Sequence, residues 1–235
     1  MAGKVPMTAT ERQRKWRAKV RRQKIWGSNA DLAARRPAPR REDVDLWPTP
    51  PCLTAALIGK VLPTLPPGVI WECAAGDGHL VDALRLAGRE VIASDIVRLR
   101  DGFLQLDFVN DPAPPRTRGG IAVTNPPYAG SGLGDPFLAR TMSLLDSGWL
   151  RAVVLLQRAD SGGTKGHAEL FNRAVAEWTC CWRPVWIPGS PGGGRWWFSW
   201  FVWIAGRSGP PINARITRDA ITRTTVATTG GATDR

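Results

Sequence analysis

Residues 69–80 read VIWECAAGDGHL, and this order of residue types predicts a strand, a tight turn and the start of a helix. The apolar run before Glu72 is typical of a buried strand, and Gly76 and Gly78 give the turn its backbone freedom. In an open α/β sheet, ligands bind at such turns, beyond the carboxyl ends of the strands. The third glycine of the dinucleotide-binding pattern is missing, so the turn does not indicate a pyrophosphate site. An ordinary strand–helix turn without a ligand is the alternative.

The rest of the chain repeats this alternation of strand and helix patterns. Strands are expected at 69–73, 90–94, 103–107, 120–124 and 151–157, and helices at 54–61, 79–87, 136–146 and 167–176. Strands separated by helices predict one α/β domain with a mostly parallel sheet and helices on both faces. Two further strands, at 178–188 and 195–204, are joined by a glycine-rich turn without a helix. They predict an antiparallel edge pair at the C-terminal end.

The charge of the chain is concentrated at its ends. The 235 residues suit one hydrophobic core and carry a net charge of +12, of which residues 1–41 carry +11 and residues 206–235 carry +3. We therefore expect a basic leader over 1–41, helical or disordered, a folded domain over 42–205, and a disordered basic tail over 206–235. A leader this basic predicts nucleic-acid contact, although a solvated segment that only aids solubility is the alternative. The candidate contacts in the leader are Arg14, Lys15, Arg17, Lys19, Arg21 and Arg22.

Several classes of protein are not indicated. The four cysteines form no C-x-x-C pair and there are two histidines, so a metal site has too few ligands at usable spacing. The sequence shows neither a secretory signal nor an apolar run of membrane-spanning length, although an organelle transit peptide is a minor alternative for the leader. We expect a cytoplasmic protein with reduced thiols and neither a metal nor a membrane partner.

Three carboxylates follow successive predicted strands. Glu72 ends the first strand, Asp95 the second, and Asp107 the short third one. Because the carboxyl ends of parallel strands meet at one edge of the sheet, these side chains should lie near one ligand. An acid about 20 residues after the glycine turn suits the paired hydroxyls of a ribose.

Residues 124–128 read TNPPY and contain the chain's single tyrosine. Asn125 directly follows a predicted strand, so it should lie at the same edge as the carboxylates. The two prolines lack N–H groups and have a fixed φ, so they end the strand and hold the next segment rigid. The Asn125 side chain and the Pro126 carbonyl can together accept both hydrogens of an amino group, and Tyr128 adds a flat ring. The set would hold a planar amine such as that of a base, although Asn-Pro is also a common turn.

Together these motifs resemble the class I S-adenosylmethionine-dependent methyltransferases, specifically the DNA adenine group that methylates amino nitrogens in phages and prophages. The signature of that group, Asp/Asn-Pro-Pro-Tyr/Phe, matches Asn125, Pro126, Pro127 and Tyr128 in full, and its cofactor turn matches 72–78, with Cys73 where proline is common. The resemblance covers about residues 44–205 and implies a Rossmann-like methyltransferase domain. The cofactor S-adenosylmethionine would be bound by Thr49, Pro50, Glu72, Cys73, Ala75, Gly76, Gly78, Asp95 and Asp107.

The resemblance implies direct methyl transfer to an adenine amine in DNA, in a bacterial, archaeal or phage-infected cell. The base would leave the helix stack and lie on Tyr128. Lys165 and Arg195, in glycine-rich loops, are further candidate nucleic-acid contacts. No target-recognition domain of the usual size is visible. An RNA adenine methyltransferase, a protein glutamine methyltransferase and a non-catalytic nucleic-acid-binding protein are the alternatives.

Overall fold

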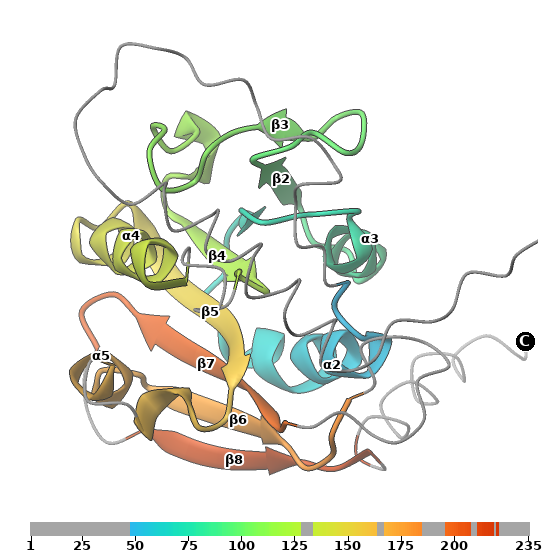
Figure 1. The fold of residues 1–235 in the computed structure, drawn as a ribbon, viewed down its shortest axis with the longest axis vertical. Helices are drawn as coiled ribbons and strands as arrows, with labels where there is room; N and C mark the ends of the chain where they lie inside the picture. Colours follow the sequence, from blue (N-terminus) through green and yellow to red (C-terminus); the bar gives the residue numbers. More distant parts are fainter. Residues whose placement is uncertain are drawn as a thin grey trace, which may run out of the picture.

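The structure, a computed structural model, describes residues 48–127, 134–163, 167–184, 196–207, 211–218 and 220. Eight strands form one sheet in the order β3-β2-β1-β4-β5-β7-β6-β8 (Figure 1). The strands are β1 Ile70–Glu72, β2 Val91–Asp95, β3 Leu104–Gln105, β4 Gly120–Thr124, β5 Leu150–Arg158, β6 Ala176–Cys180, β7 Phe198–Ile204 and β8 Ile212–Ile216.

Helices cover both faces of this sheet, α4 and α5 on one face and α2 and α3 on the other (Figure 1). The α-helices are α2 Pro51–Ala56, α3 His79–Leu86, α4 Gly134–Asp146 and α5 Ala168–Asn172. The π-helical turn η3 Leu57–Val61 and the 3-10 turn η4 Leu62–Thr64 extend α2, and η5 Pro115–Thr117 and η7 Ser161–Gly163 are short 3-10 turns. The predicted α/β domain with helices on both faces is confirmed.

The core consists of two hydrophobic clusters, one on each face of the sheet. Successive residues of a strand point to opposite faces. Accordingly, Ile70 packs in one cluster with Leu53 of α2 and Leu84 of α3. Its neighbour Trp71 packs in the other cluster with Phe137 of α4. Because both faces are covered, the inner strands are apolar along their whole length, which is the pattern that the sequence shows.

The strand directions bring one set of strand ends to a single edge. Parallel pairing links β1 with β2, β1 with β4, β2 with β3, β4 with β5, and β6 with β8. Strand β7 is antiparallel to both β5 and β6. The carboxyl ends of every strand except β7 therefore lie at one edge, together with the amino end of β7. We call this edge the carboxyl rim; it carries Glu72, Asp95, Thr124, Arg158 and Cys180 at its strand ends.

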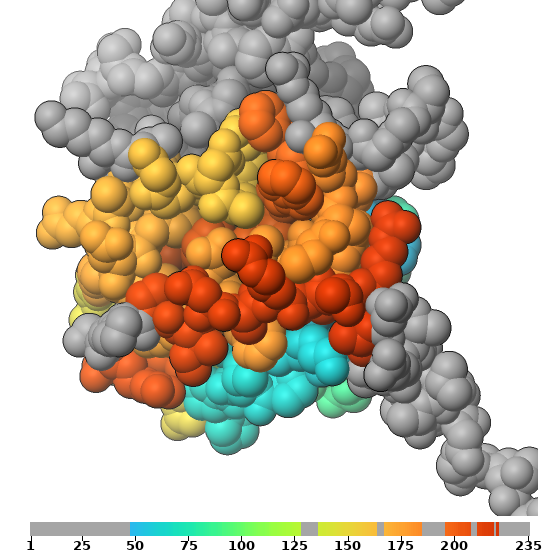
Figure 2. All heavy atoms as spheres, turned by 90° about the horizontal axis from the view of Figure 1, so that it is seen from below, coloured from blue at the N-terminus to red at the C-terminus, as the bar shows by residue number. Residues whose placement is uncertain are grey.

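Strand β8 corrects the prediction for the C-terminal segment. Residues 206–235 were expected to be a disordered tail, but Ile212–Ile216 pair with β6 and Ile216 is buried. Figure 2 views this edge of the sheet, with β8 in red running across it beside the cyan α2–η3 region. The antiparallel strands were predicted, but β8, which is parallel to β6, takes the edge position. Pairing with β6 gives the residues of β8 backbone hydrogen bonds and cross-strand contacts, and these stabilise a strand in a segment whose polar composition does not predict one.

The helix expected at 167–176 is also too long. Helix α5 ends at Asn172, and β6 already begins at Ala176. The amide of Val175 donates to the carbonyl of Val202 at 2.8 Å, so pairing with β7 replaces the last helical turn.

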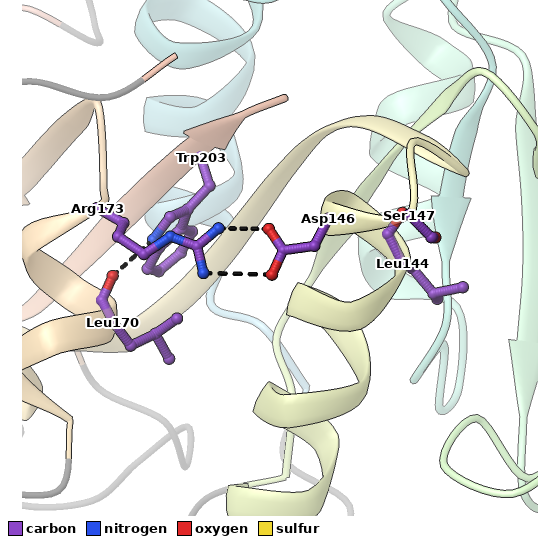
Figure 3. Close-up of polar contacts among 6 residues, drawn as sticks. All are labelled: Leu144, Asp146, Ser147, Leu170, Arg173 and Trp203. Carbon is purple, nitrogen blue, oxygen red and sulfur yellow. Dashed lines mark hydrogen bonds and ion pairs between the residues drawn. The ribbon is translucent and has the colours of Figure 1, made fainter. Parts of the chain in front are cut away.

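A polar link fastens α5 to its neighbours at the edge opposite the carboxyl rim (Figure 3). The guanidinium of Arg173 forms a two-pronged ion pair with Asp146 at the end of α4. The indole Nε1 of Trp203 donates to the carbonyl of Leu170 at 3.0 Å. A hollow of about 490 Å³ lies beside this pair. Since it lies at the amino end of β5, it is separate from the site at the carboxyl rim.

Candidate active site

The glycine turn after β1 has the left-handed backbone that only glycine adopts easily. Gly76 has a φ of 51° and Gly78 a φ of 89°. The turn is fastened to the end of β2 because the amide of Gly76 donates to Oδ2 of Asp95 at 2.8 Å and the amide of Ala75 to the carbonyl of Ser94 at 3.0 Å. These two bonds bring the glycine turn and Asp95 together at one end of the neighbouring strands β1 and β2.

Gly78 also lies where a side chain would collide with its surroundings. A Cβ atom at this position would lie 2.3 Å from Nη1 of Arg100 and 2.8 Å from Cζ of Phe103. The same guanidinium donates to the carbonyl of Asp77 at 3.3 Å and to Asp82 at 2.7 Å. Arg100 thus holds the turn against the start of α3. Sequence reasoning missed this residue, because an arginine in a loop after β2 carries no motif.

Glu72 is a buried carboxyl at the end of β1, with 1% of its surface exposed. Its Oε1 accepts the amide of Ala74 at 3.1 Å. Its Oε2 and the hydroxyl oxygen of Thr124, at the end of the neighbouring β4, are buried without a hydrogen-bond partner among the described residues. Two unpaired buried oxygens on adjacent strands fit a ligand that carries its own hydrogen-bond donors. Thr124 was missed as a site residue, although its place before Asn125 is the signal for it.

Burial shifts the ionisation of this carboxyl. Loss of solvent raises the pKa of Glu72 to about 8, since the charged form is poorly solvated there. The Ala74 amide opposes this shift, as does the Thr124 hydroxyl, which lies close to the carboxyl but outside normal hydrogen-bond geometry. The negative charge of Asp95 adds to it. At neutral pH Glu72 is therefore mainly protonated and can donate as well as accept a hydrogen bond.

Asp95 and Cys73 are the other buried titratable groups of the turn. Desolvation raises the pKa of Asp95, and the amides of Gly76 and Val97 oppose this rise by donating to its carboxylate. Burial likewise raises the pKa of the Cys73 thiol well above its ordinary value, which leaves it a neutral apolar group. A carboxylate has about four lone-pair positions, so the two amides leave Asp95 room for ligand hydroxyls.

Asn125, Pro126 and Pro127 follow β4 directly, on the strand next to Glu72. The pairing of Ile70 with Ile121 places Glu72 level with Val123, so Asn125 lies two residues further out on the carboxyl rim. Pro126 is buried, while Asn125 and Pro127 are half-buried. The structure thus brings the predicted amine-binding residues and the cofactor turn to the same end of two adjacent strands.

Thr49 and Pro50 lie at the start of α2, and both are buried. The carbonyl of Pro50 accepts the amides of Leu53 at 2.9 Å and Thr54 at 3.2 Å, and so begins the helix. Just behind them, Sγ of Cys52 accepts the indole N–H of Trp182 at 3.2 Å. Trp182 follows the carboxyl end of β6, which places the start of α2 at the carboxyl rim. The role of Thr49 and Pro50 toward a cofactor stays a prediction.

Asp107 is placed less directly than the other acids. It follows β3, but its carboxylate accepts the amides of Val109 at 3.0 Å and Asn110 at 3.3 Å and the side-chain amide of Asn110 at 2.8 Å. These bonds shape its own loop. Its role toward a cofactor stays a prediction.

The other predicted site residues lie outside the described part of the chain. They are Tyr128, the leader residues Arg14, Lys15, Arg17, Lys19, Arg21 and Arg22, and the loop residues Lys165 and Arg195. Within the described ranges, no cluster of three or more His, Cys, Asp or Glu could hold a metal ion. None of the described helices is long and apolar enough to cross a membrane.

Comparison with known proteins reveals a similarity of fold. No protein-family model and no curated protein matches the sequence. A solved structure from Pyrococcus horikoshii, provisionally assigned as an RNA methyltransferase, superposes with a TM-score of 0.52 at 14% identity, over 82% of this chain and 98% of that one.

Two further solved structures are similar. One is a 23S rRNA methyltransferase, ErmE, with a TM-score of 0.45 at 16% identity, over 77% of this chain and 79% of that one. The other is a Burkholderia thailandensis 1,6-didemethyltoxoflavin N1-methyltransferase with bound S-adenosylhomocysteine, with a TM-score of 0.46 at 12% identity, over 87% of this chain and 94% of that one. The chain therefore has the Rossmann-like fold that the Pyrococcus horikoshii protein has.

Proposed function

We propose that this protein is an S-adenosylmethionine-dependent methyltransferase that methylates the exocyclic amine of adenine in DNA. The observation that carries the proposal is the position of Asn125 and Pro126 directly after β4, on the strand next to β1, which ends in the buried Glu72 and continues into the glycine turn. A methyl donor bound at the end of β1 and an amine bound at the end of β4 would lie close enough to react with little movement. Holding two reactants close together in the right orientation accounts for a large part of the rate enhancement of a two-substrate reaction.

The residues of the turn fit this cofactor. Asp95 has lone pairs left for ribose hydroxyls, and the unpaired oxygens of Glu72 and Thr124 are available to polar groups of the methionine part. Thr49 and Pro50 lie on the same rim. The chemistry that S-adenosylmethionine would supply is a methyl group on a positively charged sulfur. Transfer to a nitrogen lone pair would leave neutral S-adenosylhomocysteine, and the methylated nitrogen would give up one of its protons to water.

The amine-binding residues would act on the nucleophile. The lone pair of an adenine amine is delocalised into the ring, so the nitrogen attacks poorly. The side-chain carbonyl of Asn125 and the main-chain carbonyl of Pro126 would accept its two N–H groups, favour a pyramidal nitrogen and stabilise the positive charge that develops on it. The two prolines hold both acceptors in place. Tyr128 would stack on the extruded base.

Tritiated S-adenosylmethionine tests the proposal. The purified full chain is offered unmethylated double-stranded DNA, single-stranded DNA, ribosomal RNA and total protein in parallel, and labelled nucleosides or amino acids are identified. Label in N6-methyladenine from DNA is the expected result. Label in protein glutamine would show that the proposed DNA substrate is wrong. Binding of the cofactor without transfer to any of the samples would indicate a non-catalytic protein.

An RNA adenine methyltransferase is the second candidate. The fold neighbour from Pyrococcus horikoshii is assigned as an RNA methyltransferase, and every residue discussed above would serve an adenine in RNA equally well. Label in methyladenosine of the RNA sample, with none in DNA, would support this candidate and retain the mechanism.

A further inference from the structure

Two exposed tryptophans lie at the carboxyl rim, on the side of Asn125 away from the cofactor turn. Trp196 and Trp197 directly precede β7, and 42% and 53% of their surfaces are exposed. Every other tryptophan in the described ranges is buried or half-buried. The amide of Ala159, which follows β5, donates to the carbonyl of Trp197 at 3.0 Å and fastens this segment to the rim.

Each of these rings is stacked against an arginine from a neighbouring strand end. The guanidinium carbon of Arg158, the last residue of β5, lies 3.6 Å from the ring centre of Trp196. That of Arg183, just beyond β6, lies 5.1 Å from the ring centre of Trp197. A planar guanidinium over an indole holds the ring in place, and the exposed part of each indole can receive a second flat group.

The charge of this surface suits a polyanion. Arg158 is paired with Asp160, with Nε to Oδ1 at 2.9 Å, so its charge is balanced locally. Arg183 is exposed, and no carboxylate of the described residues lies within ion-pair distance of it. The surface therefore combines two flat apolar faces with one unbalanced positive charge, which is the combination that binds unpaired nucleotides.

We propose that Trp196 and Trp197, backed by Arg158 and Arg183, are a stacking platform for unpaired nucleotides flanking the target base. This inference rests on the proposed function, since it names the form in which the nucleic-acid substrate is bound. The faces of a base within a duplex are covered by its neighbours, so only unpaired or extruded bases can lie on such rings. A single-stranded substrate is therefore preferred over a perfect duplex. Arg158 ends β5, the direct neighbour of β4, and the two tryptophans precede β7, the next strand in the sheet, so the platform lies on the same rim as the amine-binding residues.

The test is an equilibrium titration of the full chain with fluorescently labelled 12-residue oligonucleotides, followed by anisotropy. The probes are single-stranded DNA, RNA of the same sequence, and the DNA duplex. Trp196→Ala and Trp197→Ala should each weaken single-strand binding by about 5- to 150-fold, the range for a lost base–aromatic stack. Trp197→Phe, which keeps a flat ring, should retain most of the affinity.

Arg183→Gln should weaken binding and reduce the slope of log K against log salt by about one, because one phosphate contact is lost. The matched control is Arg118→Gln, which removes the same charge from another arginine–tryptophan pair. This pair lies at the amino ends of β4 and β5, opposite the carboxyl rim. The guanidinium carbon of Arg118 lies 5.5 Å from the ring centre of Trp149. This variant should bind as the unchanged chain does. The melting temperature of each variant and its affinity for S-adenosylmethionine should stay unchanged.

Methyl transfer to the same oligonucleotides is measured in parallel, which separates the two proposals. If the protein is active but its tryptophan variants bind single strands as tightly as the unchanged chain, the platform proposal is wrong and the proposed function stands. The surface would then be a contact for a protein partner. If single strands bind tightly and this binding depends on the two rings, but no methyl group is transferred, the proposed function is wrong and the platform proposal stands. A ratio of single-strand to duplex affinity that is the same in the unchanged chain and in both tryptophan→alanine variants would also overturn the platform.

Discussion

The carboxylate of Asp95 accepts the amide of Gly76 at 2.8 Å, and this bond joins the end of β2 to the turn that follows β1. The same carboxylate accepts the amide of Val97 at 3.3 Å. Asp95 therefore sets the shape of the glycine turn and, in the proposed function, also binds the ribose of the cofactor. Replacing it affects both roles, and the choice of substitute separates them.

Asp95→Asn should keep the turn but weaken cofactor binding. The amide oxygen of asparagine can still accept from Gly76, although the longer bond from Val97 loses its acceptor. The charge that strengthens hydrogen bonds to ribose hydroxyls is lost. We expect affinity for S-adenosylmethionine to fall about tenfold, the difference between a charge-assisted and a neutral hydrogen bond. Titration calorimetry measures it, with Asp101→Asn, an exposed carboxylate of the next loop, as the control. Equal affinities of the two variants would contradict the ribose role.

Gly78→Ala should destabilise the protein and impair the turn. The new methyl group meets Arg100 and Phe103 and also forces a residue with a side chain to a φ of 89°. Gly88→Ala is the matched control, because Gly88 has a φ of 75° and nothing within 4 Å of the added atom. The backbone penalty common to both is about 1–2 kcal/mol, and overpacking should add about 1–3 kcal/mol to the first variant alone. Urea unfolding compares them. Equal losses of stability in the two variants would show that the Arg100 and Phe103 side chains move away from the added methyl group without a cost in free energy.

The sequence allowed prediction of most of the fold because the inner strands have strong local signals. β4 was predicted with its observed bounds, Gly120–Thr124, and β1 and α3 within one residue at each end. These segments are continuous apolar runs bounded by glycine or proline. The rim carboxylates were predictable too, because a parallel sheet brings successive strand ends together.

The misses have physical causes of two kinds. β8 lies in a segment rich in polar residues, and it becomes a strand through its pairing with β6, which no local pattern shows. Arg100 and Thr124 act through distance and burial rather than through motif.

Asn125→Ala should reduce methyl transfer far more than stability. The substitution removes one of the two proposed acceptors for the amine, and loss of one such group reduces kcat by about 100- to 1,000-fold. Asn125 is half-buried after the end of β4, so the fold should tolerate the change. Transfer from tritiated S-adenosylmethionine and the melting temperature are measured on the same preparation. Tyr128→Ala should behave in the same way, and wild-type rates in either variant would contradict the site assignment.

The basic leader should supply the salt-dependent part of nucleic-acid binding. Residues 1–41 carry a net charge of +11, and each phosphate contact adds about 0.7–0.9 to the slope of log K against log salt. Deleting them should weaken binding and flatten this slope without changing affinity for the cofactor. A full-length variant with glutamine at Arg14, Lys15, Arg17, Lys19, Arg21 and Arg22 keeps the length of the leader and should give part of the same effect. An unchanged slope would reduce the leader to an aid to solubility.

Glu72 should make the stability of the protein fall as pH rises through the neutral range. Its pKa is about 8 in the folded chain, against 4.5 for an ordinary glutamate. Below pH 4.5 both the folded and the unfolded chain hold the proton, so the full stability is present. Between these values only the unfolded chain gives up the proton, and each pH unit should lower the free energy of unfolding by about 1.4 kcal/mol. Above pH 8 both forms are ionised and the loss ends.

Glu72→Gln isolates this contribution, because glutamine has nearly the same shape and stays neutral at every pH. Urea unfolding at pH 6 and pH 8 should show a loss of about 2–3 kcal/mol in the unchanged chain that is absent from the variant. The difference between the two proteins removes the contributions of other groups, including Asp95, whose pKa is also raised by burial. Glu90→Gln, an exposed carboxylate paired with Arg116, serves as the control and should keep the loss. Parallel pH profiles for the unchanged chain and Glu72→Gln would mean that Glu72 is already ionised in the folded protein, and that water or a polar group reaches its Oε2 atom.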